Sequence, residues 1–234
     1  MIIRSIKTTI FQEGEDLSAF ITGYFKKLPE RSVLVVTSKI VALAEKRTVV
    51  AENARMKEKL IRAESDLAIP TKYAWLTVKD KIVMASAGID ESNANGKLIL
   101  LPKDSFKTAY NLRDTLRQKY KVRHLGVLIT DSRTVPLRAG VIGIALGYAG
   151  FRGIKDYRGT PDIFGRKFKF SRTDIADSLA TAAVLVMGEG NERRPLAIIE
   201  KAPVEFCDKV NRAELHINIQ EDMYRPLFSK FSKR

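Results

Sequence analysis

Residues 32–47 read SVLVVTSKIVALAEKR and give the clearest indication of the fold. The run Ser32–Thr37 has the length and the β-branched content of a buried strand. It passes directly into Lys39–Glu45, which has the composition of a helix. Hydroxyls and free backbone amides at this helix start suit an anion, while the simpler interpretation of Ser38 is a helix cap. A strand that leads at once into a helix predicts a protein that mixes both kinds of element.

Working outward from this stretch, strand-like and helix-like segments are interleaved without strict alternation. That order favours the α+β class over a doubly wound parallel sheet. With no repeat and no low-complexity stretch, we expect one domain over residues 1–234. The other predicted strands are Ala74–Val78, Ile82–Ala87, Leu98–Leu101, Leu125–Thr130 and Leu196–Glu200, and the other predicted helices are Asp16–Lys27, Ala51–Ala63, Ser105–Lys119 and Thr173–Met187.

The helix Thr173–Met187 shows how local sequence sets geometry. Ser171 or Thr173 is suited to cap its first turn, and Gly188 suits its end. Its apolar residues recur at helical spacing and predict one buried stripe. Asp177 lies off the middle of that stripe, so we expect a solvated carboxylate there.

The composition excludes several classes of protein. Hydrophobic residues make up 45% and charged residues 29%, which is the balance of a folded globular chain. One cysteine, Cys207, excludes an internal disulfide and a cysteine-based zinc site, and only His124 and His216 are available as histidine bases. Cysteine–histidine catalysis is therefore disfavoured. Neither an apolar signal core nor an apolar run long enough to span a bilayer occurs, so we expect a cytoplasmic protein without a membrane partner.

The formal net charge of +14 predicts an anionic partner. Residues 101–180 hold sixteen basic and seven acidic residues, so most of the excess lies in one window beside glycine-rich segments. This concentration indicates a pocket for phosphate or carboxylate groups, and a nonspecific basic face is the alternative. No stretch clusters aromatic and basic residues as RNA-binding motifs do, which argues against a nucleic-acid partner.

Two polar segments that follow apolar strands are candidates for a metal site. The first, SAGIDESNANG at residues 86–96, contains Asp90 and Asn93 among small polar residues. The second, VLITDSRTVPLRAG at residues 127–140, has Asp131 and Ser132 at the end of an apolar run. Carboxylate, amide and hydroxyl oxygens are the ligands that Mg²⁺ or Mn²⁺ selects. A polar turn without a ligand remains the alternative for each segment taken alone.

Residues 141–168 read VIGIALGYAGFRGIKDYRGTPDIFGRKF and space glycines among small and charged residues. The segment has neither the end of a Walker loop nor a dinucleotide-binding fingerprint, so standard nucleotide folds are disfavoured. We expect its glycines to permit turns and close backbone approach. Its charged side chains, Arg158 among them, are expected to line the edge of a pocket.

Taken together and in order, these motifs resemble the coenzyme F420-0:gamma-glutamyl ligase family. The resemblance covers most of the chain and implies a compact α+β fold, a homodimer, and binding of GTP and a divalent metal. It further implies an enzyme that joins glutamate by an amide bond to the side-chain carboxylate of a deazaflavin. The matching motifs are GEDL, SKIVALAE, AGIDESN, LLPKD, ITDS, VPLRAG, IGIALGYAG, DYRGTPDIFGR, ADSLATAA and LVMGEG.

The resemblance also assigns site residues. Asp90, Asp131 and Ser132 match the metal ligands, Asn93 matches a nucleotide contact beside the metal, and Ser38 with Lys39 matches a further nucleotide-binding pair. From the chemistry of a phosphorylated intermediate we add two basic residues, Arg138 and Arg158, as clamps for phosphate or for the acceptor carboxylate.

Departures from the family pattern keep alternatives open. Lys7, Thr8 and Thr9 stand where the family has a guanine-contacting loop, so ATP or another nucleoside triphosphate is an alternative to GTP. The segment RTVPLRAG after Asp131 also departs from the pattern, which leaves room for a different carboxylate acceptor. A noncatalytic module that binds a nucleotide or another anion on the same scaffold is the alternative from another class.

Overall fold

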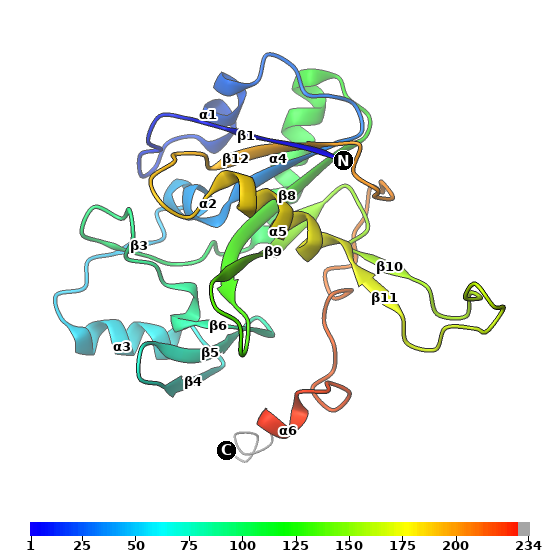
Figure 1. Ribbon diagram of the computed structural model, residues 1–234. Helices are drawn as coiled ribbons and strands as arrows, with labels where there is room; N and C mark the ends of the chain where they lie inside the picture. Colours follow the sequence, from blue (N-terminus) through cyan, green and yellow to red (C-terminus); the bar gives the residue numbers. More distant parts are fainter. Residues whose placement is uncertain (229–234) are drawn as a thin grey trace.

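The computed structural model describes residues 1–228 and centres on a five-stranded mixed sheet (Figure 1). The strand order is β1-β12-β2-β8-β9. Only β2 and β8 run parallel within this sheet, and the other neighbours are antiparallel, which confirms the α+β class. The strands span β1 (Ile2–Ile6), β2 (Ser32–Thr37), β8 (Leu125–Thr134), β9 (Val141–Ala149) and β12 (Leu196–Glu200).

Helices cover both faces of this sheet. Helices α1 (Leu17–Tyr24) and α4 (Ser105–Tyr120) pack on one face, and α5 (Ile175–Met187) packs on the other. Strand β2 supplies both cores, because Leu34 and Val36 face α1 and α4 while the alternate valines face α5. Each fully buried aliphatic side chain stabilises the fold by about 1.5–3 kcal/mol. The apolar run of β2 is therefore buried on two sides, as its sequence predicts.

Strand β9 was not predicted, because glycines interrupt its apolar pattern. Those glycines allow two helices to approach the sheet: a Cβ atom on Gly143 would lie 2.4 Å from the Ala180 carbonyl oxygen of α5, and one on Gly147 would lie 2.5 Å from the Phe106 nitrogen of α4. The expectation of close backbone approach is confirmed here. The register of β8 against β9 also shifts between Ile129 and Thr130, which leaves Leu146 without a directly paired residue.

Residues 48–101 form a smaller region beside the main sheet. It contains helix α3 (Ala54–Ala63) and the three-stranded sheet of β4 (Leu67–Pro70), β5 (Trp75–Lys79) and β6 (Ile82–Ala85). A 3-10 turn, η1 (Ser86–Gly88), follows β6, and the short strands β3 (Thr48–Val49) and β7 (Leu98–Ile99) pair where this region returns to the body. Strands β1 and β4 were also missed by the sequence prediction.

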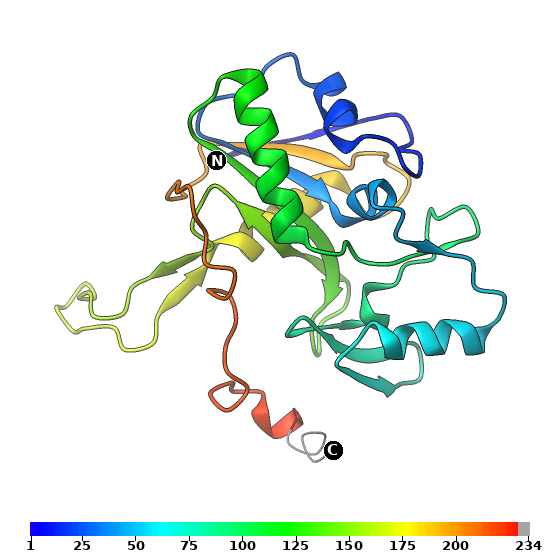
Figure 2. The same ribbon diagram turned by 180° about the vertical axis from the view of Figure 1, so that it is seen from behind.

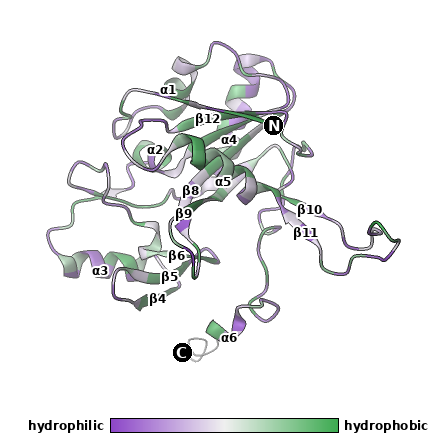
Figure 3. Cartoon of the chain, in the orientation of Figure 1, coloured by the Kyte–Doolittle hydropathy of each residue, from purple (hydrophilic) through white to green (hydrophobic). Residues whose placement is uncertain are grey.

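Two further parts extend from the body. Strands β10 (Ile154–Asp156) and β11 (Arg172–Asp174) pair to form the base of an arm, residues 154–174, which projects to the side opposite α3 in both views (Figures 1 and 2). The chain after β12 forms a C-terminal strap, residues 202–227, which leads into α6 (Arg225–Phe228). Hydrophobic segments concentrate in the main sheet and α5, whereas the arm and the strap are more mixed (Figure 3).

The start of α5 corrects a prediction. Residues 172–174 belong to strand β11, and the helix begins at Ile175 instead of Thr173. Its cap is Asp174, which accepts a hydrogen bond from the Asp177 nitrogen at 2.9 Å, instead of Ser171 or Thr173. Within residues 1–228, no helix combines the length and the apolar character that crossing a membrane requires.

Candidate active site at the strand ends

The point where the parallel pairing of β2 with β8 ends brings Ser38 and Asp131 together. Thr37 and Thr130 are the last residues that pair between β2 and β8, so Ser38 and Asp131 follow this pair on neighbouring segments. The prediction that the second strand ends at Thr130 is wrong, because β8 continues to Thr134 through its pairing with β9. Ser38 is the first residue of α2 (Ser38–Ala44), and its hydroxyl donates a hydrogen bond to the Asp131 carboxylate. The simpler interpretation of Ser38 as a cap is wrong, because Thr37 holds the cap position.

Asp90 reaches the same edge from the loop after η1. Its backbone exchanges two hydrogen bonds with Ile99, each 2.9 Å long, which fix the loop against β7. The Lys39 ammonium lies 2.7 Å from the Asp90 Oδ2 atom and donates to the Ser92 carbonyl oxygen at 2.9 Å. The Ser92 nitrogen donates to Asp90 Oδ1 at 2.6 Å. Lys39, two residues from the β2 strand, therefore ties this loop to the main sheet.

Asp90 and Asp131 differ sharply in their electrostatics. Burial raises the pKa of Asp90, but hydrogen bonds from Lys39 and Ser92 outweigh it and hold the pKa below its ordinary value. For Asp131, burial prevails over the hydrogen bonds from Ser132 and Ser38, and the pKa rises to about 6. The negative charges of Asp90 and Glu189 add to this rise. The two carboxylates thus lie close enough to repel each other. The hydrogen bonds to Asp131 do not offset the cost of burying its charge, whereas those to Asp90 do.

We refer to Ser38, Lys39, Asp90 and Asp131 as the strand-end site. Asn93 lies in the same loop as Asp90, and its side-chain amide donates to the Gly190 carbonyl oxygen at 3.3 Å. Glu189 is a neighbour that residue-level reasoning missed. It follows α5 in the segment LVMGEG, which entered only through the family resemblance. Its nearness to Asp131 depends on how α5 crosses the sheet.

The Ser132 side chain does not lie beside the Asp131 carboxylate, as a second ligand of the same metal would. Asp131 and Ser132 are consecutive in the regular part of β8, so their side chains point to opposite faces. The backbone N–H of Ser132, however, donates to the Asp131 carboxylate. Ser132 therefore contacts Asp131 through its main chain.

The donor set fits a hard divalent cation bound mainly by substrate oxygens. Asp90 and Asp131 offer carboxylates from two converging segments, and the raised pKa of Asp131 marks an acid that a cation would stabilise in its charged form. Among residues 1–228, no group of three or more histidine, cysteine, aspartate or glutamate side chains is arranged to hold a metal ion. The remaining ligands of such a cation would be phosphate and water oxygens.

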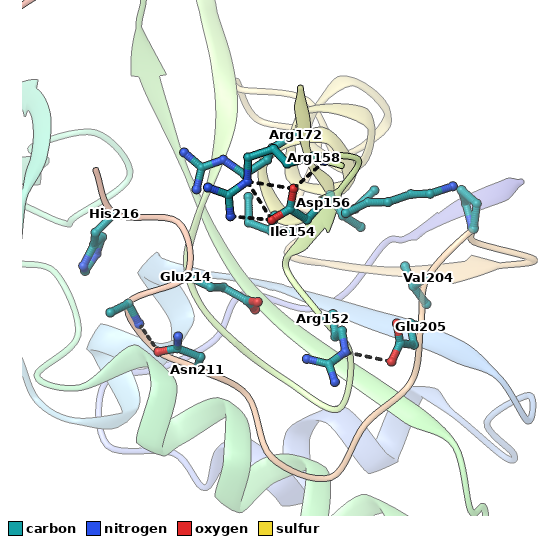
Figure 4. Close-up of a pocket in the computed structure, with 14 residues that line it drawn as sticks. Arg152, Ile154, Asp156, Arg158, Arg172, Val204, Glu205, Asn211, Glu214 and His216 are labelled. Atoms are coloured by element: carbon teal, nitrogen blue, oxygen red, sulfur yellow. Dashed lines mark hydrogen bonds and ion pairs between the residues drawn. The ribbon is translucent and has the colours of Figure 1, made fainter. Parts of the chain in front are cut away.

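The two predicted arginine clamps lie elsewhere in this chain. Arg138 is exposed in the loop between β8 and β9. Arg158 lies on the arm, where it forms a 2.5 Å ion pair with Asp156 and borders a pocket of about 840 Å³ (Figure 4). The hydrogen bond from Arg158 lowers the pKa of Asp156 to about 2. The structure thus brings Ser38, Lys39, Asp90 and Asp131 together and places Arg158 outside that group.

The expectation of a solvated Asp177 is wrong. The carboxylate is half-buried, and its Oδ1 atom accepts a hydrogen bond from the Ala145 nitrogen of β9 at 2.8 Å. Its other oxygen lies 3.8 Å from the Arg133 guanidinium. Asp177 therefore fastens α5 to β9. The helical pattern could not show this contact because the acceptor strand was not predicted.

Comparison with known proteins assigns the chain to a class of ligases. The family described as F420-0:Gamma-glutamyl ligase matches residues 5–201, and the chain belongs to this family. Similar curated proteins are named Coenzyme F420:L-glutamate ligase. That of Methanococcus maripaludis strain C7 is 29% identical over 96% of this chain and 97% of its own length. That of Methanopyrus kandleri is 34% identical over 79% and 80%, and that of Methanocaldococcus jannaschii is 35% identical over 71% and 66%.

Proposed function

We propose that this protein joins L-glutamate through an amide bond to the carboxylate of coenzyme F420-0, with GTP or another nucleoside triphosphate as the energy source. The convergence of Asp90 and Asp131 where the pairing of β2 with β8 ends is the observation that carries the proposal. The names of the similar ligases support the choice of glutamate and of the deazaflavin acceptor.

The proposed reaction has two steps, phosphoryl transfer to the acceptor carboxylate and then amide formation. First, an acceptor carboxylate oxygen attacks the terminal phosphorus of the nucleotide, the bond to the β-phosphate oxygen breaks, and the nucleoside diphosphate leaves. Second, the glutamate amine attacks the acyl carbon, and inorganic phosphate leaves with the electron pair of the C–O bond. The proton of the amine passes to solvent or to the leaving phosphate. The product is an amide, which the free carboxylate could not form without activation.

The strand-end site supplies the groups that this chemistry needs. Asp90 and Asp131 would hold Mg²⁺ or Mn²⁺, which would supply positive charge to offset that of the phosphate groups. Lys39 holds Asp90 in place and brings positive charge to the triphosphate. Ser38 orients Asp131 through its hydroxyl, and Asn93, three residues after Asp90, would contact the nucleotide. Arg138 and Arg158 stay predictions as phosphate or carboxylate clamps.

A reconstituted assay tests the proposal. The full-length protein is incubated with coenzyme F420-0, L-glutamate, Mn²⁺ or Mg²⁺, and GTP or ATP, and phosphate release is measured beside the mass of the deazaflavin product. We expect release only when all components are present, with a product heavier by a glutamyl residue. Release that requires another carboxylate would indicate a different acceptor. Nucleotide binding without release under any condition would indicate a noncatalytic module.

We also propose a cytoplasmic homodimer, on the basis of the family resemblance and the single cysteine. The arm exposes large apolar side chains beyond its two strands, with Ile163, Phe164 and Phe170 each 87–90% exposed. Such exposure is typical of a surface that another chain covers. Light scattering coupled to size exclusion would give twice the mass of the chain if the proposal holds.

A further inference from the structure

A second pocket, of about 670 Å³, lies where three parts of the chain meet. Its walls come from β6 and the start of α4, from the adjoining ends of β8 and β9, and from the C-terminal strap. Its size is in the range of sites that take a drug-sized ligand, and it is too large for glutamate alone. Phe106, Ile144 and Leu215 contribute apolar surface, so the pocket suits a ligand with a substantial apolar part.

One end of this pocket lies close to the strand-end site. Arg133 lines the pocket and is two residues beyond Asp131 on β8, so both side chains leave the same face of the strand. Their Cα atoms are about 7 Å apart at the rise of a strand. A group bound at Arg133 is therefore within reach of a phosphate held at Asp131.

The Arg133 guanidinium has at least one N–H donor without a hydrogen-bond partner among the described residues. Its ion pair with Asp177 is 3.8 Å long, beyond hydrogen-bond distance. Its Nε atom is buried and has no hydrogen-bond partner among the described residues. A buried donor without a partner costs stability unless a ligand satisfies it. A carboxylate is the group that an arginine binds best, because two parallel N–H donors match its two oxygens.

The strap forms a fixed wall of the pocket. Glu214 accepts hydrogen bonds from the Tyr148 hydroxyl at 2.5 Å and from the Gly153 nitrogen at 2.7 Å. Arg212 pairs with Asp104 at the start of α4, 3.1 Å away. These contacts fasten the strap at residues 212–214, and His216 and Tyr224 of the strap also line the pocket. The strap lies beyond residue 201, where the match to the family ends.

We propose that this pocket binds the carboxylate acceptor, with Arg133 holding the acceptor carboxylate toward Asp131 and the strap covering the apolar part of the molecule. The proposal rests on the proposed function for the identity of the acceptor. It assigns Arg133 and Tyr224 to acceptor binding and leaves the nucleotide to the strand-end site.

The main test removes the Arg133 charge while preserving its bulk. In the reconstituted assay, Arg133→Met is expected to raise the KM for coenzyme F420-0 about tenfold or more, as the loss of a charge-assisted hydrogen bond predicts. The KM values for GTP and glutamate should stay within about twofold, and Arg133→Lys should recover part of the loss. A rise confined to the glutamate KM, or no change in any KM, would overturn the assignment.

The strap is tested by a matched pair of neighbours. Tyr224 lines the pocket, whereas Met223 does not line it and is 81% exposed. Tyr224→Ala should weaken acceptor binding several-fold, and Met223→Ala should leave it unchanged; equal effects would contradict the proposed wall.

Calorimetry with coenzyme F420-0 alone separates this inference from the proposed function. Binding that is lost in Arg133→Met supports the pocket even if no ligation occurs. Ligation by the wild type with unaltered acceptor binding in both pocket variants refutes the pocket while the proposed function stands. No binding of coenzyme F420-0 by the wild type refutes both.

Discussion

Asp131 at the strand-end site and Asp156 on the arm are both aspartates near a strand end with arginine close by in sequence, yet their surroundings differ. On the arm, Arg158 is two residues away and satisfies Asp156, so the pKa falls to about 2. At the strand ends, burial and the charge of Asp90 act on Asp131, and the pKa rises to about 6. On the arm, Arg158 provides the positive charge that stabilises the Asp156 carboxylate. The charges that act on Asp131 are negative, so a bound cation would stabilise its carboxylate. A buried acid whose hydrogen bonds do not offset the cost of burial is the better candidate for a ligand site.

The largest expected effect follows from removing the Asp131 charge. Asp131→Asn should lower metal-dependent nucleotide turnover by a factor on the order of 10²–10³, because it removes charge stabilisation of the moving phosphoryl group. Phosphate release measures the loss, and circular dichroism checks that the fold is kept. Asp114→Asn, at an exposed carboxylate on α4 that accepts from Gln118, is the control and should retain full turnover. Full turnover in Asp131→Asn would refute its role.

The next effect concerns stability and pH. Between about pH 4 and pH 6 the folded protein keeps the Asp131 proton while the unfolded chain has released it, so this group lowers stability as pH rises through that window. Asp131→Asn removes the penalty and should be more stable than the wild type at pH 8 by up to about 3 kcal/mol, with no gain at pH 4. Urea unfolding at the two pH values measures it. Equal stabilities at pH 8 would show that Asp131 already has a countercharge.

A smaller effect tests how tightly the main sheet is packed beside the site. Gly143→Ala should destabilise the protein by about 1–3 kcal/mol, because the added Cβ would lie 2.4 Å from the Ala180 carbonyl oxygen. Thermal unfolding measures the change. Gly23→Ala in α1, where no atom lies within 4 Å of the added Cβ, is the matched control and should leave stability equal or raised. A neutral Gly143→Ala would mean that α5 is free to move away from β9.

The smallest effect is expected on the arm. Asp156→Asn breaks an exposed ion pair, so neither the melting temperature nor the rate of phosphate release should change measurably. Both are measured beside the wild type at the same ionic strength. If phosphate release instead fell as far as in Asp131→Asn, the Asp156 carboxylate itself would be needed for turnover and the contrast between the two aspartates would fail.

Much of the fold could be predicted from the sequence, because strong local patterns coincide with buried elements. Strands β2 and β12 were predicted with their full bounds, since both are apolar runs buried in the sheet. Strand β9 was missed because its glycines serve packing against α4 and α5, which no local pattern reveals. Strands β10 and β11 were missed because they are short and rich in charge.

The candidate site could be predicted in part for a similar reason. Ser38 and Asp131 each follow an apolar run of the sequence, so both could be singled out before their neighbours were known. The continuation of β8 beyond Asp131 could not, because it depends on pairing with β9. The contribution of Glu189 and the pairing of Lys39 with Asp90 depend on segments that meet only in the folded chain. The hydrogen bond by which Asp177 of α5 accepts from Ala145 of β9 could not be predicted either, because it also joins segments that meet only in the folded chain.

Leu146, the unpaired residue of β9, makes the length of this strand critical, whereas the length of the preceding loop is not. Its side chain lines the pocket beside Ile144, and the two-to-one pairing at this point sets which residues of β9 face α5. Deleting one residue between Gly143 and Gly147 would turn every preceding side chain of the strand over and direct a bulky group at the helix in place of Gly143. The connection at residues 135–140 lies between the two strands, so a change in its length does not reverse which side chains of β9 face α5. Variation in length among homologous chains should therefore accumulate in that connection and be excluded from the strand beside it.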